Sequence, residues 1–343
     1  MAGTGGWAMT RLTGGRLLGA IVALLPLVIG MGGQAHGVSA ATPSLPYVSL
    51  VFSRSEMTAM DGTACAVDDA NIVRTDAVVA PYLAQLGIRA AGSLETTPTR
   101  VTGYWCAHYG ESAAISWTEA QLLSKLYGWS FVSHTATYPK TAAAWLAMDP
   151  AQLYAETCGS ALAISSHGLT GASGMFLWPR SDVDPAALPF VEQCFDVSRT
   201  YHGMGVTTQA QVDTAPYEVR TLGLWGGRCN DPALPCASLT TPVPYMLPST
   251  VIGRLDALQA GQWFSLQSFI LVTGTNPAYK TNLSRWDCTS PNPADHWSND
   301  AERYCYSDFQ AIMAAIHQKI ATNGLISGEP ASIAAAFGRN VSP

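Results

Sequence analysis

Residues 128–139 are the segment that most constrains what this chain can fold into. An apolar run of β-branched and aromatic residues follows a helix-like stretch, ends at His134 and passes into a threonine-rich turn closed by Pro139. Such a run predicts a buried strand that leads into a loop. In α/β proteins, ligands and catalytic groups gather at the carboxyl ends of buried strands. We therefore expect His134 to lie at a functional strand end.

Strand and helix patterns alternate along the rest of the chain. Ser116 and Glu119 have the spacing of a capping box, and Ser307 is expected to cap the last helix. Strands followed by helices predict an α/β fold, a (β/α) barrel with fewer or less regular strands than eight. Strands are predicted over 47–52, 88–94, 174–180, 202–206, 221–225 and 261–271, and helices over 73–86, from 116, over 151–162 and from 307 to 320.

Charge and the N-terminal segment limit the possible partners. The net charge is −6 and no Lys/Arg run is present, which argues against nucleic-acid binding. Arg11 and Arg16 precede a short apolar run broken by Gly and Pro, and small residues before Ala41 fit a cleavage site. We predict a signal peptide over 1–40, one domain over 41–343, a secreted, extracellular protein and no stable membrane insertion after cleavage; a membrane anchor is the alternative.

Eight cysteines follow the predicted signal peptide. An even number in an exported chain favours disulfides, and the absence of a Cys-x-x-Cys pair argues against a zinc ribbon. The spacing leaves the connectivity open. If neighbours pair, the bridges are Cys65–Cys106, Cys158–Cys194, Cys229–Cys236 and Cys288–Cys305.

The segment from Gly128 to Tyr138 resembles a motif of polysaccharide deacetylases of the NodB-homology type, carbohydrate esterase family 4. That motif reads Gly-Trp-Glu-(Ile/Leu)-(Ala/Gly)-(Ser/Asn)-His-(Ser/Thr)-x-x-His, and its two histidines hold a divalent metal. Further matches follow in the family's order, at 47–52, 83–94, 261–271 and 304–309. The resemblance implies a distorted, disulfide-stabilised NodB-type barrel that acts on a polysaccharide or cell-wall glycan, with His134 as a metal ligand.

The chain departs from this family at the residues that carry the chemistry. Tyr138 stands where the second histidine is expected, and Ser53 and Arg54 stand where the family has its catalytic and metal-binding aspartates. One histidine cannot hold zinc usefully, so the missing ligands disfavour a zinc cofactor. The loop after residue 54 is acidic, and Asp61 or Asp69 is a candidate to replace the lost carboxylate. A turn at Asp61 and a helix cap at Asp69 are the structural alternatives.

Aromatic residues supply the candidates for substrate binding. Trp178 follows a predicted strand and could stack on a pyranose ring, with packing in the core as the alternative. Trp129 and Trp263 are further candidates, and Gln267 lies near the position of the family's general-acid histidine.

Three functional hypotheses remain open from the sequence. In the first, Asp61 or Asp69 joins His134, together with His108 or His167, in a rebuilt metal or acid/base site that hydrolyses amide or ester groups of a glycan. In the second, Arg54, His134 and Tyr138 form a metal-free pocket in which paired acids act as in a glycosidase. In the third, the barrel is inactive and binds a glycan through its tryptophans.

Overall fold

The computed structural model describes residues 43–53, 71, 73–97, 115–139, 141–200, 205–224, 245–276, 286–298 and 303–339. Arg54, Asp61 and Asp69 lie outside these residues, as do His108 and the predicted signal peptide. The predictions made for them remain predictions.

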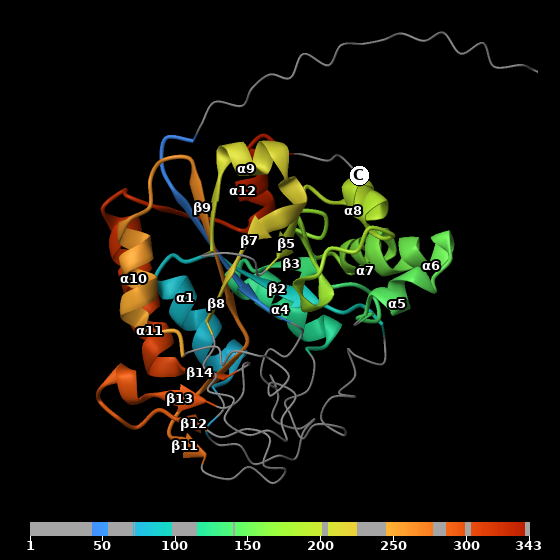
Figure 1. Cartoon of the computed structure of the whole chain (residues 1–343). Helices are drawn as coiled ribbons and strands as arrows, with labels where there is room; N and C mark the ends of the chain where they lie inside the picture. The colour runs from blue at the N-terminus through green and yellow to red at the C-terminus, as the bar shows by residue number, and fades with distance from the viewer. Residues whose placement is uncertain are drawn as a thin grey trace, which may run out of the picture. The chain divides into compact units, whose positions relative to one another are not determined.

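A mostly parallel β-sheet forms the centre of the fold (Figure 1). Neighbouring strands follow the order β6-β9-β1-β2-β3-β4-β5-β7, in which β6 is antiparallel to β9 and the other pairs are parallel. The strands span Tyr47–Phe52 (β1), Ala90–Leu94 (β2), Ser130–Ser133 (β3), Met175–Leu177 (β4), Val197–Thr200 (β5), Val206–Thr208 (β6), Val219–Arg220 (β7), Leu222–Leu224 (β8) and Gln262–Ser268 (β9).

Residues 219–224 bring the two ends of this sheet together. Strand β7 pairs with β5, and β8, which follows after Thr221, pairs with β9. Thr221 keeps contact with both sides, because its backbone N–H donates to Thr200 O (3.0 Å) and its hydroxyl to Ser265 Oγ (2.9 Å). The sheet is therefore a nearly closed barrel, and the predicted (β/α) barrel is confirmed.

Side chains alternate between the barrel interior and the surrounding helices, as the pleat of a strand requires. In β1, Leu50 and Phe52 pack in the larger hydrophobic cluster with the helices, whereas Val51 belongs to a separate interior cluster. The interior cluster also contains Ala91, Val132, Met175, Leu177, Val197, Val219 and Trp263. Polar residues that are two or four positions from these apolar residues on the same strand lie on the same inner face.

Helices surround the barrel and close one end of it. Val212 of α9 and Ile333, Ala334 and Phe337 at α12 join the interior cluster, and Gln209 Nε2 donates to Phe337 O at 3.0 Å. Figure 1 shows α9 and α12 together at the end where the strands begin. The helices span Ala80–Gln85 (α1), Trp117–Tyr127 (α4), Ala142–Leu146 (α5), Pro150–Tyr154 (α6), Ser160–Ser166 (α7), Leu188–Cys194 (α8), Gln209–Thr214 (α9), Pro248–Asp256 (α10), Tyr306–Ala321 (α11) and Pro330–Ala336 (α12).

Shorter elements complete the fold. One-turn π-helical stretches at Thr75–Val79 and Ala155–Gly159 lead into α1 and α7. Short 3₁₀ turns cover Pro179–Ser181, Pro216–Glu218 and Pro293–Asp295. The remaining strands are Ile270–Val272 (β10), Thr275–Asn276 (β11), Trp286–Asp287 (β12), Trp297–Ser298 (β13), Arg303–Cys305 (β14) and Ile326–Ser327 (β15).

Local sequence signals account for most helix ends. The capping box at α4 is confirmed, since Glu119 N donates to Ser116 Oγ and Ser116 N to the Glu119 carboxylate. Gly128 ends that helix with φ +67°, a conformation that glycine adopts without strain. The prediction for α11 was wrong, because Cys305 is the N-cap and Ser307 is already the second helical residue.

Two of the four suggested disulfides are present, and the other two lie outside the described residues. Cys158–Cys194 joins the π-helical stretch to the end of α8, and Cys288–Cys305 joins the segment after β12 to the end of β14, with Cα–Cα distances of 5.5 and 5.6 Å. Each bridge links two segments that are separated along the chain, and both bridges lie outside the central barrel sheet.

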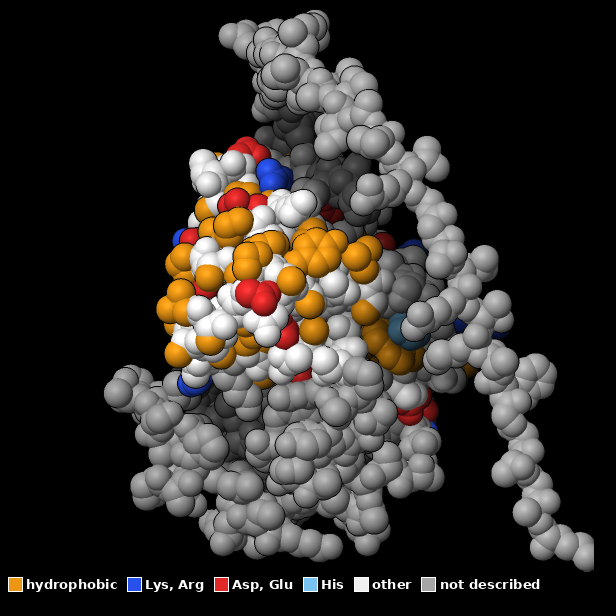
Figure 2. All heavy atoms as spheres, turned by 90° about the vertical axis from the view of Figure 1, so that its right-hand side faces the viewer, with side chains coloured by type: hydrophobic (Ala, Val, Ile, Leu, Met, Phe, Trp, Pro, Cys, Tyr) orange, Lys and Arg blue, Asp and Glu red, His pale blue; other side chains and the backbone are white. Residues whose placement is uncertain are grey.

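The helical surface carries apolar side chains. Leu146, Tyr154 and Leu162, from α5, α6 and α7, are 73%, 41% and 56% exposed. Figure 2 shows hydrophobic side chains spread between a few charged ones over the described part of the face that α5–α8 occupy in Figure 1. Within the described residues, no helix has the length and apolarity needed to span a membrane.

Candidate functional site

Polar side chains converge inside the barrel near the carboxyl ends of its strands. Glu95 and His134 directly follow β2 and β3, Arg199 lies in β5, Gln267 lies in β9 and Ser53 directly follows β1. All five are at most 2% exposed. Each is separated by an even number of residues from an apolar residue of the interior cluster, which places it on the inner face of its strand.

His134 and Glu95 form the centre of this group. Strands β2 and β3 pair in parallel with Leu94 opposite Ser133, so the residues that follow both strands emerge side by side. His134 N donates to Leu94 O at 2.9 Å and continues the ladder. The His134 Nδ1 atom is 3.9 Å from Glu95 Oε1, a distance at which a carboxylate and a protonated imidazole attract each other.

Tyr138 completes the environment of the imidazole. Its ring stacks on that of His134, with centroids 4.9 Å apart and an interplanar angle of 17°. The intervening turn is tight, because Tyr138 N donates to Thr135 Oγ1 (2.9 Å) and both residues have positive φ. Two of the predicted catalytic residues therefore lie in contact, and an aromatic ring occupies the position expected for a second metal-binding histidine.

Gln267 and Ser53 present unused hydrogen-bonding groups to the interior. Within the described parts of the chain, the amide nitrogen and oxygen of Gln267 have no hydrogen-bond partner, and the Ser53 hydroxyl has none either. Buried polar groups normally have partners, so those without one mark positions where a ligand or water completes the bonding. Gln267, a candidate for substrate binding from the sequence, thus lies on the inner face of β9.

The sequence analysis missed Glu95 and Arg199. The signal that could have found them is the alternation of a strand. Glu95 lies four residues after Ala91, and Arg199 lies two residues after Val197, so each shares a strand face with an apolar residue. Their importance depends on neighbouring strands that are distant in sequence, and a single strand does not reveal which of its faces points inward.

His167 does not belong to this group. It follows α7, and the chain then reaches β3 at its amino-terminal end, where Phe131 N donates to Thr170 O (2.8 Å). The imidazole stacks on Trp117, with centroids 3.8 Å apart, and its Nδ1 lies 2.8 Å from Ala163 O. The expectation that His167 joins His134 is corrected, because the two lie at opposite ends of β3.

The three predicted sugar-binding tryptophans are core residues. Trp129, Trp178 and Trp263 are at most 1% exposed. Trp178 Nε1 donates to Ser198 Oγ and Trp263 Nε1 to Ser49 Oγ, so both indole N–H groups are satisfied inside the protein. No face of these rings is open to a pyranose in the described structure, which argues against their proposed stacking role.

The described residues around His134 do not fit a structural or catalytic zinc site. Such sites use at least three protein ligands, whereas here one imidazole and one carboxylate face each other, and Arg199, a cation, lies on the inner face of β5. Asp61 and Asp69, the predicted replacements, lie outside the described residues.

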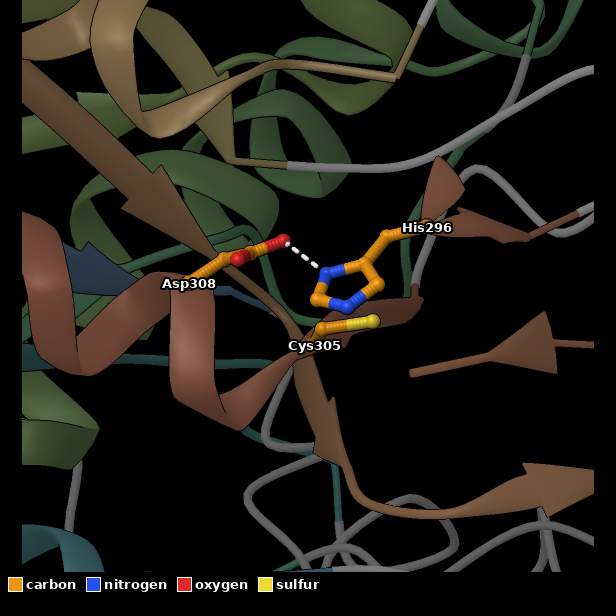
Figure 3. Close-up of side chains that lie close together, drawn as sticks. All are labelled: His296, Cys305 and Asp308. Carbon is orange, nitrogen blue, oxygen red and sulfur yellow. Dashed lines mark hydrogen bonds and ion pairs between the residues drawn. The ribbon is translucent and has the colours of Figure 1, made fainter. Parts of the chain in front are cut away.

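A second cluster of potential ligands lies near α11 (Figure 3). His296, Cys305 and Asp308 have donor atoms within 4.8 Å of one another. The Cys305 sulfur is bonded to Cys288, however, and the ring nitrogens of His296 contact Asp308 Oδ2 and Ser290 O, both at 2.7 Å. Both ring nitrogens and the sulfur are therefore already engaged within the protein, and the cluster is a buried, hydrogen-bonded His296–Asp308 pair beside a disulfide.

No protein-family model matches the sequence, and no curated protein matches it either. Among solved structures, the chain is similar to a putative polysaccharide deacetylase from Mycobacterium smegmatis, with 11% identity, a TM-score of 0.47 and coverage of 88% of this chain and 98% of the other. A family 4 carbohydrate esterase from Streptomyces lividans has 14% identity and a TM-score of 0.36, over 88% and 100% of the two chains. A peptidoglycan N-acetylglucosamine deacetylase has 8% identity and a TM-score of 0.41, over 88% and 93%. Polysaccharide deacetylases, the family that the motif around His134 resembles, are thus among the solved structures to which this chain is similar.

Proposed function

We propose that this chain is a secreted, polysaccharide-deacetylase-like hydrolase that removes acyl groups from an extracellular or cell-wall glycan. The observation that carries the proposal is the buried Glu95–His134 pair at the carboxyl ends of adjacent barrel strands. The motif around His134 and the order of the strand motifs support the choice of a glycan as substrate.

The pair has the components of acid/base catalysis. A carboxylate beside the Nδ1 atom of a histidine favours the tautomer whose other nitrogen accepts a proton, and it stabilises the imidazolium that results. His134 would accept a proton from the attacking water and return it to the leaving amine or alcohol. Glu95 would hold the imidazole in orientation.

Donors for the developing negative charge are present on the same inner face. Hydrolysis of an amide or ester places charge on the carbonyl oxygen, and fixed donors at that oxygen lower the barrier. The Gln267 amide has no hydrogen-bond partner among the described residues, and Arg199 lies on the inner face of β5, two residues after Val197 of the interior cluster. In this assignment, the acid/base and donor roles are filled by protein side chains, without a metal ion.

A barrel that binds glycan without cleaving it is the second candidate. Ser53 and Arg54 replace the two aspartates of the family motif, and Ser53 is 2% exposed at the interior end of β1. Its hydroxyl can bind a sugar or a water but is not a base at neutral pH.

Acetate release from N-acetylated and O-acetylated glycans, measured with and without a chelator, tests the hydrolase proposal. We expect turnover that survives chelation and that falls about 100-fold or more in His134→Ala and Glu95→Gln, since general acid/base groups contribute factors of this size. His167→Ala is the matched control, because it removes an imidazole from the other end of β3. Retention on the glycan without acetate release would support the binding alternative. Turnover that requires added metal and persists in Glu95→Gln would instead support a metal site built with the loop acids.

A further inference from the structure

The turn that carries His134 and Tyr138 is held by a carboxylate from another part of the fold. Glu156 Oε2 accepts hydrogen bonds from Ala136 N (3.0 Å) and Thr137 N (2.8 Å), and Glu156 Oε1 accepts one from Thr137 Oγ1 (2.5 Å). Glu156 is 6% exposed. Hydrogen bonds to an ionised group are stronger than neutral ones, so this side chain is a firm anchor for the turn.

An irregular helical stretch positions Glu156. The residue lies in the π-helical turn Ala155–Gly159, between α6 and α7, and such turns are frequent at functional sites because they redirect side chains. Cys158 in the same turn is bonded to Cys194, and Ser160, directly after it, contacts Ser133 at the end of β3. The anchor is therefore fixed to the fold on its own side.

The opposite edge of the turn binds the segment that carries Glu95. Thr96 N donates to Thr135 O (3.2 Å), and Thr97 N donates to Ala136 O (3.0 Å). Ala136 thus uses its N–H toward Glu156 and its carbonyl toward the residues that follow Glu95. A displacement of the turn would move both members of the Glu95–His134 pair.

The turn needs such an anchor because its backbone is strained. Thr135 and Tyr138 have φ values of +70° and +61°, and non-glycine residues in this region are held there by their surroundings at a cost on the order of 1 kcal/mol each. Without the Glu156 hydrogen bonds, relaxation of either residue would change the stacking of Tyr138 on His134.

We propose that Glu156 is a positioning residue that sets the geometry of His134, Tyr138 and Glu95 from outside the barrel. The inference rests on the proposed hydrolytic function for its kinetic consequence, and it concerns a residue that touches neither the substrate nor the reacting atoms.

Three substitutions and one control separate positioning from general stability. Glu156→Ala removes all three hydrogen bonds. Glu156→Asp shortens the side chain by one methylene and so draws the carboxylate away from both backbone amides. Glu156→Gln keeps the shape and one acceptor oxygen. Asp149→Ala is the control, since Asp149 also accepts a backbone N–H, from Gln152 (2.9 Å), but at the start of α6 and away from the turn. Thermal melting gives the stability loss of each variant.

Kinetics and histidine NMR on the full chain provide the readouts. We expect kcat for acetate release to fall about 10- to 100-fold in Glu156→Ala with little change in KM, since small displacements of catalytic groups have effects of this size. Glu156→Gln should recover most of the loss, and Asp149→Ala should leave kcat unchanged. The ring signals of His134, identified by their loss in His134→Ala, should move in Glu156→Ala toward their positions in Tyr138→Ala, because the stacked ring shifts them.

The two proposals can fail separately. If the wild-type chain releases no acetate, the hydrolase proposal fails. The role of Glu156 is then still decided by the NMR signals of the His134 ring and by the hydrogen-exchange rates of the Ala136 and Thr137 amides. Faster exchange at both amides in Glu156→Asp is the expected result, and it remains measurable should Glu156→Ala not fold. Unchanged His134 signals in Glu156→Ala, or unchanged exchange in Glu156→Asp, would overturn the inference.

Discussion

Removal of the Cys158–Cys194 bridge should destabilise the protein by an amount set mainly by loop length. The two cysteines are 36 residues apart. In the chain-entropy description, a cross-link over a loop of this length lowers the entropy of the unfolded chain enough to stabilise the fold by about 3.8 kcal/mol at 25 °C. Replacement of both cysteines by alanine leaves the fold without this contribution and without a new buried polar group.

Urea unfolding followed by tryptophan fluorescence measures this difference. We expect the Cys158→Ala/Cys194→Ala variant to lose about 3–4 kcal/mol of unfolding free energy relative to the oxidised wild type. The slope of the free energy against urea should rise, since an unfolded chain without the cross-link exposes more surface. The variant with Cys288→Ala/Cys305→Ala is the comparison, and its separation of 17 residues predicts about 3.1 kcal/mol.

The outcome also bears on the strand-end group. A loss below about 1 kcal/mol with an unchanged slope would refute the reasoning, because it would mean that the bridge does not restrict the unfolded chain. Because Cys158 lies two residues from Glu156, removal of this bridge should also loosen the turn after His134. Removal of Cys288–Cys305 should not, and this difference distinguishes local anchoring from overall stability.

Three further predictions follow from packing and charge. Gly174→Ala should destabilise the fold by about 1–3 kcal/mol in urea unfolding, because the added Cβ would lie 2.3 Å from a side-chain carbon of α12. Gly253→Ala should instead stabilise it by about 1 kcal/mol, because this exposed position in α10 has no atom within 4 Å of the added Cβ. Equal effects of the two substitutions would contradict the packing argument. His296→Ala should cost about 1–3 kcal/mol of unfolding free energy, because it removes the contact at 2.7 Å between the imidazole and the buried Asp308 carboxylate, and an unchanged unfolding free energy would contradict this reasoning. Burial raises the pKa of Tyr245 and Tyr304 above the ordinary tyrosine range, so their stabilising effect is complete below about pH 10 and is lost at higher pH. Absorbance at the phenolate band should show these two phenols ionising together with alkaline unfolding, and ionisation in the folded state would refute this prediction.

Local patterns in the sequence predicted much of the fold. The β-branched run at 47–52 forms β1, the Ser116–Glu119 capping box starts α4, and Gly128 ends that helix where a left-handed residue is needed. Cys158–Cys194 and Cys288–Cys305 pair between sequence neighbours as suggested. These features depend on interactions within short stretches of chain, so composition and spacing contain the necessary information.

The tertiary structure alone decided which polar residues meet. His134 could be placed at a strand end from its own segment, but its neighbour Glu95 became evident only from the register between β2 and β3. The sequence could not show that Trp178 and Trp263 are enclosed, because burial of a large ring depends on elements far away in the chain. Nor could it show that Glu156 supports the turn after β3, since a π-helical turn and a disulfide jointly aim that side chain. Strand and helix patterns are encoded locally, whereas a site is made by contacts among segments that only folding brings together.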